Sequence, residues 1–295
     1  MVQTKSEWIG WAAQLACVFE VLAEKPGNVT RYRDCANLRL EQFLVSAVAV
    51  GPAFRPEPGD SVGSMILRAV ADTQLLAAVN TNVGIVLLLA PLALAASQDD
   101  AGGLRAALGR VLRGLDQQDA RQAFAAICQA APQGLDAVEE GDVRTAEIRF
   151  TLLEAMAMAK DRDSLAREYV TDFSIVFELG LPCLTRLWAE GRRLSQAIVQ
   201  TFLTILAAVP DTDIARKLDP QAAAAVSGQA ARVLADGGVF SEAGRQALAL
   251  FDDRLRDGER RFNPGTTADL VTAVVFVFLI TEMRAEEVPS LLARW

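Results

Sequence analysis

The sequence predicts an all-α protein, a single compact bundle of many helices with buried apolar helices at its centre. Hydrophobic residues make up 52% of the chain but aromatic residues only 6%, and alanine and leucine dominate. Alanine and leucine are strong helix formers, whereas β-branched and aromatic residues favour strands. Apolar residues also recur at helical spacing along most of the chain, and prolines and glycines fall between these stretches.

The first part of the chain divides at its prolines and glycines. Pro26-Gly27 should end a helix that begins near Ser6, because proline cannot continue a helix and glycine permits a turn. Gly51-Pro52 should end a second helix in the same way, and Asp60-Ser61 can cap a third. The helices expected here are 6–23, 40–50, 61–79, 83–96, 100–115 and 118–130.

The second part carries fewer clear breaks. Gly180-Leu181-Pro182 is expected to break one helix, and Pro210 to end the next. No internal repeat and no linker rich in proline, glycine or serine divides the chain, so we expect one domain over residues 1–295. The helices expected here are 142–159, 194–208, 219–235, 241–257 and 267–284.

Two apolar runs raise the question of a membrane. Val83–Ala96 and Leu270–Thr281 are both shorter than the ~20 residues that a membrane span needs. Helices that are apolar all round belong in the middle of a large bundle, so we predict no membrane partner. Met1–Trp8 is polar and does not resemble a signal peptide, which favours a cytoplasmic location. The apolar surplus is compatible with a homodimer.

Charge and residue usage exclude several functions. The net charge is −8 and no basic stripe stands out, so we expect no nucleic-acid partner. The chain has no histidine, which excludes Ser-His-Asp catalysis and the usual Cys/His zinc sites. Carboxylates and a metal ion are therefore the groups that remain for catalysis. The cysteines, which form no C-x-x-C pair and suit a reducing compartment, are Cys17, Cys35, Cys128 and Cys183.

Polar motifs lie at the ends of apolar helices, where unpaired backbone groups attract ligands. Glu20 lies on an apolar helix face, and a buried carboxylate requires a partner or a ligand. Lys25, Arg31 and Arg33 follow it closely. This stretch is either a phosphate-binding loop with an acidic anchor or a solvated turn. Its candidate site residues are Glu20, Lys25, Gly27, Asn28, Arg31 and Asp34.

Two further motifs lie in the middle of the chain. Asn80, Thr81, Asn82 and Gly84 precede or begin the most hydrophobic helix, and a helix start needs only one capping residue. The surplus amides therefore indicate ligand recognition, with a simple helix start as the alternative. Arg167-Glu168 lies in a charge-dense segment that is either part of a site or a solvated helix face with i,i+4 pairs.

The pair Asp211 and Asp213 follows a predicted buried helix and suits an oxygen-liganded cation. Magnesium typically takes one or two carboxylates together with substrate phosphates and water. Arg216 and Lys217 could hold those phosphates. Aspartate is also a common turn residue, so an ordinary turn is the alternative.

The last motif opens the last apolar helix. A glycine turn before Thr266-Thr267 offers backbone N–H groups to an anion, although the G-K-[ST] element of a P-loop is missing. Asp269 in the first turn could instead be a simple partner of the helix dipole. The candidates here are Asn263, Gly265 and Asp269.

These motifs, in this order, resemble the triphosphoribosyl-dephospho-coenzyme A synthase family. The chain differs from the family pattern at Tyr32–Asn37, where the family carries a G-A-H-x-D segment, and at Asn82, where some members have a histidine and a lysine. The similarity spans about residues 10–285. It rests on Glu20-Val21 with Lys25–Val29, Asn80–Gly84, Arg167-Glu168 with Phe173, Asp211-Thr212 with Arg216, and Asn263–Asp269.

The resemblance implies an all-helical transferase. It would move the triphosphoribosyl group of Mg-ATP to a hydroxyl of 3′-dephospho-coenzyme A and release adenine, with Mg²⁺ as cofactor and ATP as substrate. Two alternatives stay open. One is a different nucleotide- or phosphosugar-dependent step in the biosynthesis of another cofactor, such as a one-carbon carrier, and the other is a non-catalytic nucleotide-binding helical protein.

The resemblance also suggests roles for the candidate residues. Asp211 and Asp213 would hold the metal, and with Asp34 they would stabilise positive charge on the sugar. Glu20 or Glu168 would act as base on the acceptor hydroxyl. The residues expected to bind substrate are Lys25, Gly27, Asn28, Arg31, Asn80, Thr81, Asn82, Gly84, Arg167, Arg216, Lys217, Asn263, Gly265 and Asp269.

Overall fold

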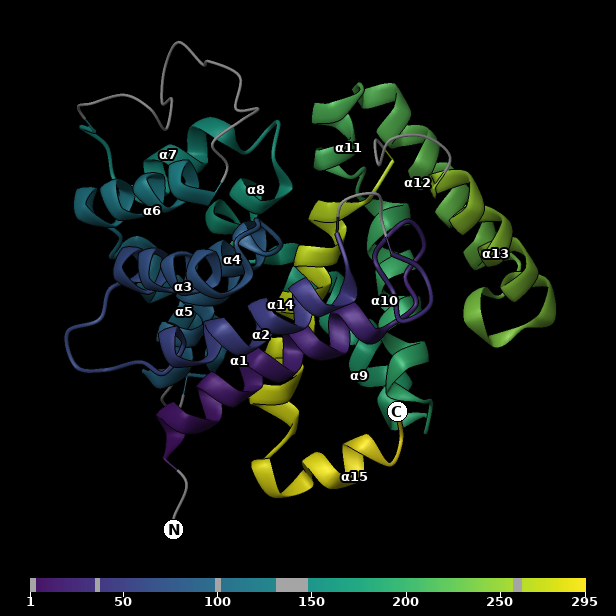
Figure 1. Ribbon diagram of the computed structural model, residues 1–295, viewed down its shortest axis with the longest axis horizontal. Helices are drawn as coiled ribbons and strands as arrows, with labels where there is room; N and C mark the ends of the chain where they lie inside the picture. The colour runs from purple at the N-terminus through teal and green to yellow at the C-terminus, as the bar shows by residue number, and fades with distance from the viewer. Residues whose placement is uncertain (1–3, 35–37, 99–101, 131–147, 257–261) are drawn as a thin grey trace. The chain divides into compact units, whose positions relative to one another are not determined.

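The computed structural model describes residues 4–34, 38–98, 102–130, 148–256 and 262–295. The chain falls into two compact units: unit 1 comprises 1–15 and 42–173, and unit 2 comprises 16–41 and 174–295. The described ranges are helical and contain no β-strand, which confirms the predicted all-α class (Figure 1). The expectation of one domain over residues 1–295 stays a prediction.

Unit 1 is built from short and medium helices. In it α3 packs against α4 and α6, α4 packs against α5, and α7 packs against α8. Its elements are the first part of α1 (Lys5–Leu22), most of α2 (Leu40–Ala53), α3 (Val62–Ala77), α4 (Val83–Ser97), α5 (Leu104–Arg113), α6 (Gln117–Ala130), α7 (Leu152–Ala159) and α8 (Ser164–Val170).

Helix starts in unit 1 follow local side-chain chemistry. Ser61 caps α3 by accepting a hydrogen bond from the N–H of Ser64. Thr151 and Glu154 form a capping box, so α7 begins at Leu152. The predicted helix over 142–159 was therefore too long, because residues 148–151 are not helical. Its first residues, 142–147, lie outside the described ranges.

Unit 2 is arranged around α14. This helix packs against α9, α10 and α11, while α12 packs against both α10 and α13. The elements of unit 2 are the end of α1, α9 (Leu181–Ala189), α10 (Leu194–Ala208), α11 (Thr212–Lys217), α12 (Pro220–Ala235), α13 (Glu242–Arg256), α14 (Gly265–Glu282) and α15 (Val288–Leu292).

The predicted helix break at Gly180-Leu181-Pro182 was wrong. A π-helical segment, Ile175–Gly180, runs directly into α9, and the N–H of Leu181 donates to the carbonyl of Val176, five residues back. This register differs by one residue from that of an α-helix, and Pro182 stands in the first turn of α9, where a missing N–H is tolerated. The chain therefore passes the proline without leaving helical geometry.

The two apolar runs form buried helices, as predicted. In α4, residues Ile85–Ala93 are buried without interruption. By length and composition α14 alone among the described helices could cross a membrane, but 72% of it is buried inside the protein. Burial of this kind is what a core helix requires, since its sides are apolar all round.

Candidate active site

Three of the five sequence motifs come together in unit 2. Gly27 has a φ of 76°, and a Cβ at this position would lie 3.0 Å from Leu255 and from Pro264. The loop after α1 therefore lies against α13 and against the turn before α14. A Cβ on Gly265 would lie 3.1 Å from Oδ2 of Asp213, which places α11 beside the same turn.

Asp211 joins the beginnings of α11 and α14. Its Oδ1 accepts hydrogen bonds from the N–H groups of Asp213 (3.0 Å) and Ile214 (3.1 Å). Its Oδ2 accepts from the N–H (2.7 Å) and the hydroxyl (2.8 Å) of Thr267. Burial raises the pKa of Asp211 to about 6, although the bonds from Thr267 oppose that rise. Four donors thus occupy this carboxylate.

Asp213 forms a surface cluster with two basic residues of the same helix. Its carboxylate pairs with the guanidinium of Arg216, and its Oδ2 lies 2.5 Å from Nζ of Lys217. The side chains of Arg216 and Lys217 are 59% and 39% exposed, against 15% for Asp213. Two cations and one carboxylate give this cluster a net positive charge. The cluster lies at the surface beside the turn before α14.

Glu20 and Lys25 form a buried ion pair at the end of α1. Oε1 of Glu20 lies 2.9 Å from Nζ of Lys25. The same ammonium donates to the carbonyl of Ala23 at 3.1 Å and to that of Glu20. Lysine near a helix C-terminus commonly satisfies the last carbonyls in this way. Lys25 thereby gives the buried carboxylate a partner and fixes the start of the loop.

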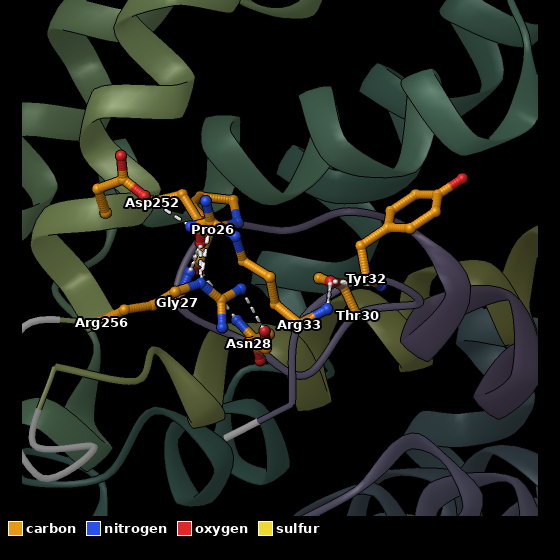
Figure 2. A network of polar contacts seen from close by, with 9 residues as sticks. Pro26, Gly27, Asn28, Thr30, Tyr32, Arg33, Asp252 and Arg256 are labelled. Atoms are coloured by element: carbon orange, nitrogen blue, oxygen red, sulfur yellow. Dashed lines mark hydrogen bonds and ion pairs between the residues drawn. The ribbon is translucent and has the colours of Figure 1, made fainter. Parts of the chain in front are cut away.

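The loop after α1 is held by α13 in a network of polar contacts (Figure 2). Asp252 accepts from the N–H of Gly27 (2.7 Å) and from Nε of Arg256 (2.8 Å). Arg256 in turn donates through Nη2 to the carbonyl of Asn28 at 2.7 Å. Sequence reasoning missed Asp252 and Arg256. Their i,i+4 spacing predicts only a pair with each other, because nothing in it points to a loop more than 220 residues earlier.

The remaining candidates of unit 2 differ in exposure. Arg31 is exposed and has no polar partner within the described ranges. Asp34 is also exposed, and its Oδ1 accepts from the N–H of Leu40 at 3.3 Å. Burial raises the pKa of the Cys17 thiol, and the nearby negative charges of Glu20 and Asp269 raise it further. Cys35 and the rest of 35–37 lie outside the described residues.

The Asn80–Gly84 motif lies in unit 1, at the start of α4. Oδ1 of Asn80 accepts from the N–H of Val83 at 3.3 Å, and the hydroxyl of Thr81 lies 2.6 Å from that of Ser46. Asn82 is buried and donates from Nδ2 to Thr73 at 3.3 Å. Its Oδ1 is buried and has no hydrogen-bond partner among the described residues.

The Arg167-Glu168 motif also lies in unit 1, on α8. Arg167 is exposed and donates from Nε to the carbonyl of Lys160 at 3.3 Å, whereas Glu168 is fully buried. The hydroxyl of Tyr169 donates to the carbonyl of Leu87 at 2.5 Å, which joins α8 to α4. Unit 1 therefore contains two of the motifs, on helices that contact each other, and unit 2 brings three together. That all five form one site stays a prediction.

Comparison with known proteins supplies a family. The chain matches the model of the ATP:dephospho-CoA triphosphoribosyl transferase family over residues 6–288. A relative from Citrobacter koseri, assigned as a 2-(5''-triphosphoribosyl)-3'-dephosphocoenzyme-A synthase, is 26% identical over 93% of this chain and 90% of its own. A synthase of the same name from Escherichia fergusonii is 32% identical over 37% of this chain and 36% of its own.

A solved structure agrees with these relatives. The crystal structure of a protein from Archaeoglobus fulgidus, assigned as a triphosphoribosyl-dephospho-CoA synthase, matches with a TM-score of 0.63 and 27% identity. The match covers 82% of this chain and 100% of the other. Since the family model spans nearly the whole chain, this protein belongs to the ATP:dephospho-CoA triphosphoribosyl transferase family and is a transferase.

Proposed function

We propose that this protein moves the triphosphoribosyl group of ATP to a hydroxyl of 3′-dephospho-CoA and releases adenine. The family match over residues 6–288 supports the reaction. The observation that carries the site assignment is that the turn before α14 contacts the loop after α1 at Gly27 and also contacts Asp213, the partner of Arg216 and Lys217. An anionic triphosphate fits this place, because exposed basic side chains and a helix N-terminus both attract negative charge.

The candidate residues divide between binding and support. Arg216 and Lys217 are exposed and would contact the triphosphate, and Arg31 would add a third positive charge. Lys25 is buried against Glu20, so we propose that it shapes the loop instead of touching phosphate. Asp211 would likewise position α11 and α14 through its four hydrogen bonds.

The transfer itself is a substitution at C1 of the ribose. The acceptor oxygen forms a bond to C1, and the bond from C1 to the adenine nitrogen breaks. A carboxylate accepts the hydroxyl proton, and the departing adenine nitrogen takes up one proton, so the net result is transfer of the hydroxyl proton to adenine. Positive charge builds on the sugar during this step, and nearby carboxylates stabilise it. Asp34, Glu20 and Glu168 are our candidates for these roles, and Asn80, Asn82 and Asn263 for orienting the sugar or the base.

Magnesium fits one part of this arrangement. No group of three or more Asp, Glu, Cys or His side chains suited to a metal occurs among the described residues. Magnesium needs only one or two carboxylates when phosphates supply further oxygens. Asp213 would hold it, since its carboxylate lies beside the turn before α14 and is paired only with side chains that are themselves partly exposed. In the same turn the buried Oδ1 of Asn263 has no partner in the described ranges. When bound, the ion would neutralise part of the triphosphate charge.

Assembly and location are proposed separately. A homodimer would account for part of the apolar surplus in the composition, and sedimentation velocity on the purified protein tests it. A cytoplasmic location would suit an enzyme of this family, since ATP and dephospho-CoA are intracellular metabolites. Cell fractionation with an antibody against the native protein tests the location.

The reaction is tested by product analysis. Purified protein incubated with Mg-ATP and 3′-dephospho-CoA should yield free adenine and a product heavier by the triphosphoribosyl group, seen by chromatography and mass spectrometry. The double variant Arg216→Ala/Lys217→Ala should raise the KM for ATP about 100-fold, because two charge-assisted contacts are lost. Arg254→Ala, which changes an exposed arginine of α13, is the matched control. Turnover without adenine, or nucleotide binding without turnover, would refute the proposal in favour of the two alternatives.

A further inference from the structure

We propose that Asp252 and Arg256 of α13 are positioning residues for nucleotide binding, a role that rests on the proposed function. They hold the Pro26–Asn28 segment of the loop after α1 in the conformation that places it beside Pro264, next to the start of α14. Neither residue belongs to the motifs on which the family resemblance rests.

Asp252 and Arg256 form an ion pair, and each of them also makes a hydrogen bond to the backbone of the loop. Asp252 accepts from the N–H of Gly27 at 2.7 Å, and both of its oxygens accept from Nε of Arg256, at 2.8 and 2.9 Å. Arg256 donates through Nη2 to the carbonyl of Asn28 at 2.7 Å. The pair thus binds the backbone of two consecutive residues, Gly27 through its N–H donor and Asn28 through its carbonyl acceptor, which fixes the orientation of the loop as well as its place.

Burial makes these bonds stronger than an ordinary surface pair. The side chains of Asp252 and Arg256 are 19% and 16% exposed, so water screens them only partly. Arg33 adds a contact to Asp252 at 3.0 Å, and Tyr32 points away from the network in Figure 2. The carboxylate of Asp252 therefore connects a donor of the loop to two guanidinium groups.

Gly27 explains why the loop needs such a restraint. Its φ of 76° is a conformation that other residues rarely adopt, and Leu255 and Pro264 fill the space where a Cβ would stand. Glycine also leaves the unbound backbone free to take many other conformations. The bonds from Asp252 and Arg256 select one of them, and that conformation keeps the loop in contact with the turn at Pro264.

The test measures steady-state kinetics of two conservative variants, Asp252→Asn and Arg256→Lys, with Mg-ATP and 3′-dephospho-CoA. Each should raise the KM for ATP roughly tenfold, the size expected for a hydrogen bond to a charged group. The kcat should stay within about threefold of wild type, because the contacts act on binding and not at C1 of the ribose. Asp253→Asn, which affects an exposed neighbour bonded to Arg33, is the control and should leave both constants unchanged.

The outcomes separate this inference from the proposed function. A KM for ATP within twofold of wild type in both variants would overturn the inference while adenine release stands, and so would an equal change in Asp253→Asn. A lower melting temperature with an unchanged KM would also overturn it, because that is the effect of a purely structural pair. If the wild-type protein releases no adenine, the proposed function fails, and calorimetric titration with Mg-ATP tests the inference instead: weaker binding by both variants supports it and equal binding overturns it.

Discussion

Replacing Asp211 by asparagine should destabilise the protein, and by an amount that depends on pH. The amide keeps one oxygen for the N–H groups of Asp213 and Ile214. It puts an NH₂ group where Oδ2 now accepts from the N–H and hydroxyl of Thr267. Two donors would then face each other at a buried position, and the Thr267 N–H would lose its acceptor.

The magnitude has two parts. An unsatisfied buried N–H costs about 1–3 kcal/mol, and this part is the same at every pH. The second part comes from the pKa of Asp211, which burial raises from 3.8 to about 6. Since each unit corresponds to about 1.4 kcal/mol, the shift amounts to ~3 kcal/mol. A raised acid pKa means that the folded state binds more protons, so this stabilisation is present below pH ~4 and is lost as the pH rises through 6.

The measurement is urea unfolding of wild type and Asp211→Asn at several pH values from 4 to 7.5. The difference in unfolding free energy between them should be largest near pH 4 and should shrink by up to ~3 kcal/mol towards pH 7.5. A difference that stays constant or grows with pH would refute the reasoning, because the four hydrogen bonds would then outweigh burial.

Three further substitutions test the supports of the site. Lys25→Met should lower the free energy of unfolding in urea by about 3–5 kcal/mol, because it leaves the buried carboxylate of Glu20 without its partner. Adding Glu20→Leu should recover most of that loss. Gly27→Ala should lower the free energy of unfolding by about 1–3 kcal/mol, because of the positive φ and the contacts with Leu255 and Pro264. It should also raise the KM for ATP, and an unchanged KM would show that the loop does not take part in nucleotide binding. Tyr169→Phe should lower the unfolding free energy by about 1–2 kcal/mol, because the bond to the carbonyl of Leu87 is lost, and should leave that KM unchanged.

The helices could be predicted because their signals are local. Thr151 and Glu154 show why one boundary was nonetheless wrong: the capping-box pattern is visible in the sequence, and it defines the start of α7 better than apolar periodicity does. Pro182 shows the limit of such signals. Proline usually ends a helix, but the π-helical register before it changes which backbone groups need partners, and that register is not written in the residues around it.

The candidate site was harder to predict because its polar groups have distant partners. Asp211 and Asp213 look alike in the sequence, yet one is buried under Thr267, 56 residues later, and the other lies at the surface with Arg216 and Lys217. A pattern of two aspartates cannot distinguish these environments. Asp252 was missed for the same reason, since its partner in the loop after α1 is 225 residues away.

The two aspartates beside the turn before α14 suit different roles, one in structure and one in binding. Asp211 is fully bonded and buried, so it can fix where α11 and α14 begin but has no lone-pair direction left to offer a ligand. Asp213 is held by side-chain cations that are themselves exposed, and a triphosphate can replace its carboxylate as their partner without exposing any buried charge. Under the proposed function, Asp213 would keep Arg216 and Lys217 oriented in the absence of nucleotide. In the proposed site, the two cations would pair with phosphate and the oxygens of Asp213 would then be available to hold magnesium, so the same three side chains would serve the empty and the loaded site.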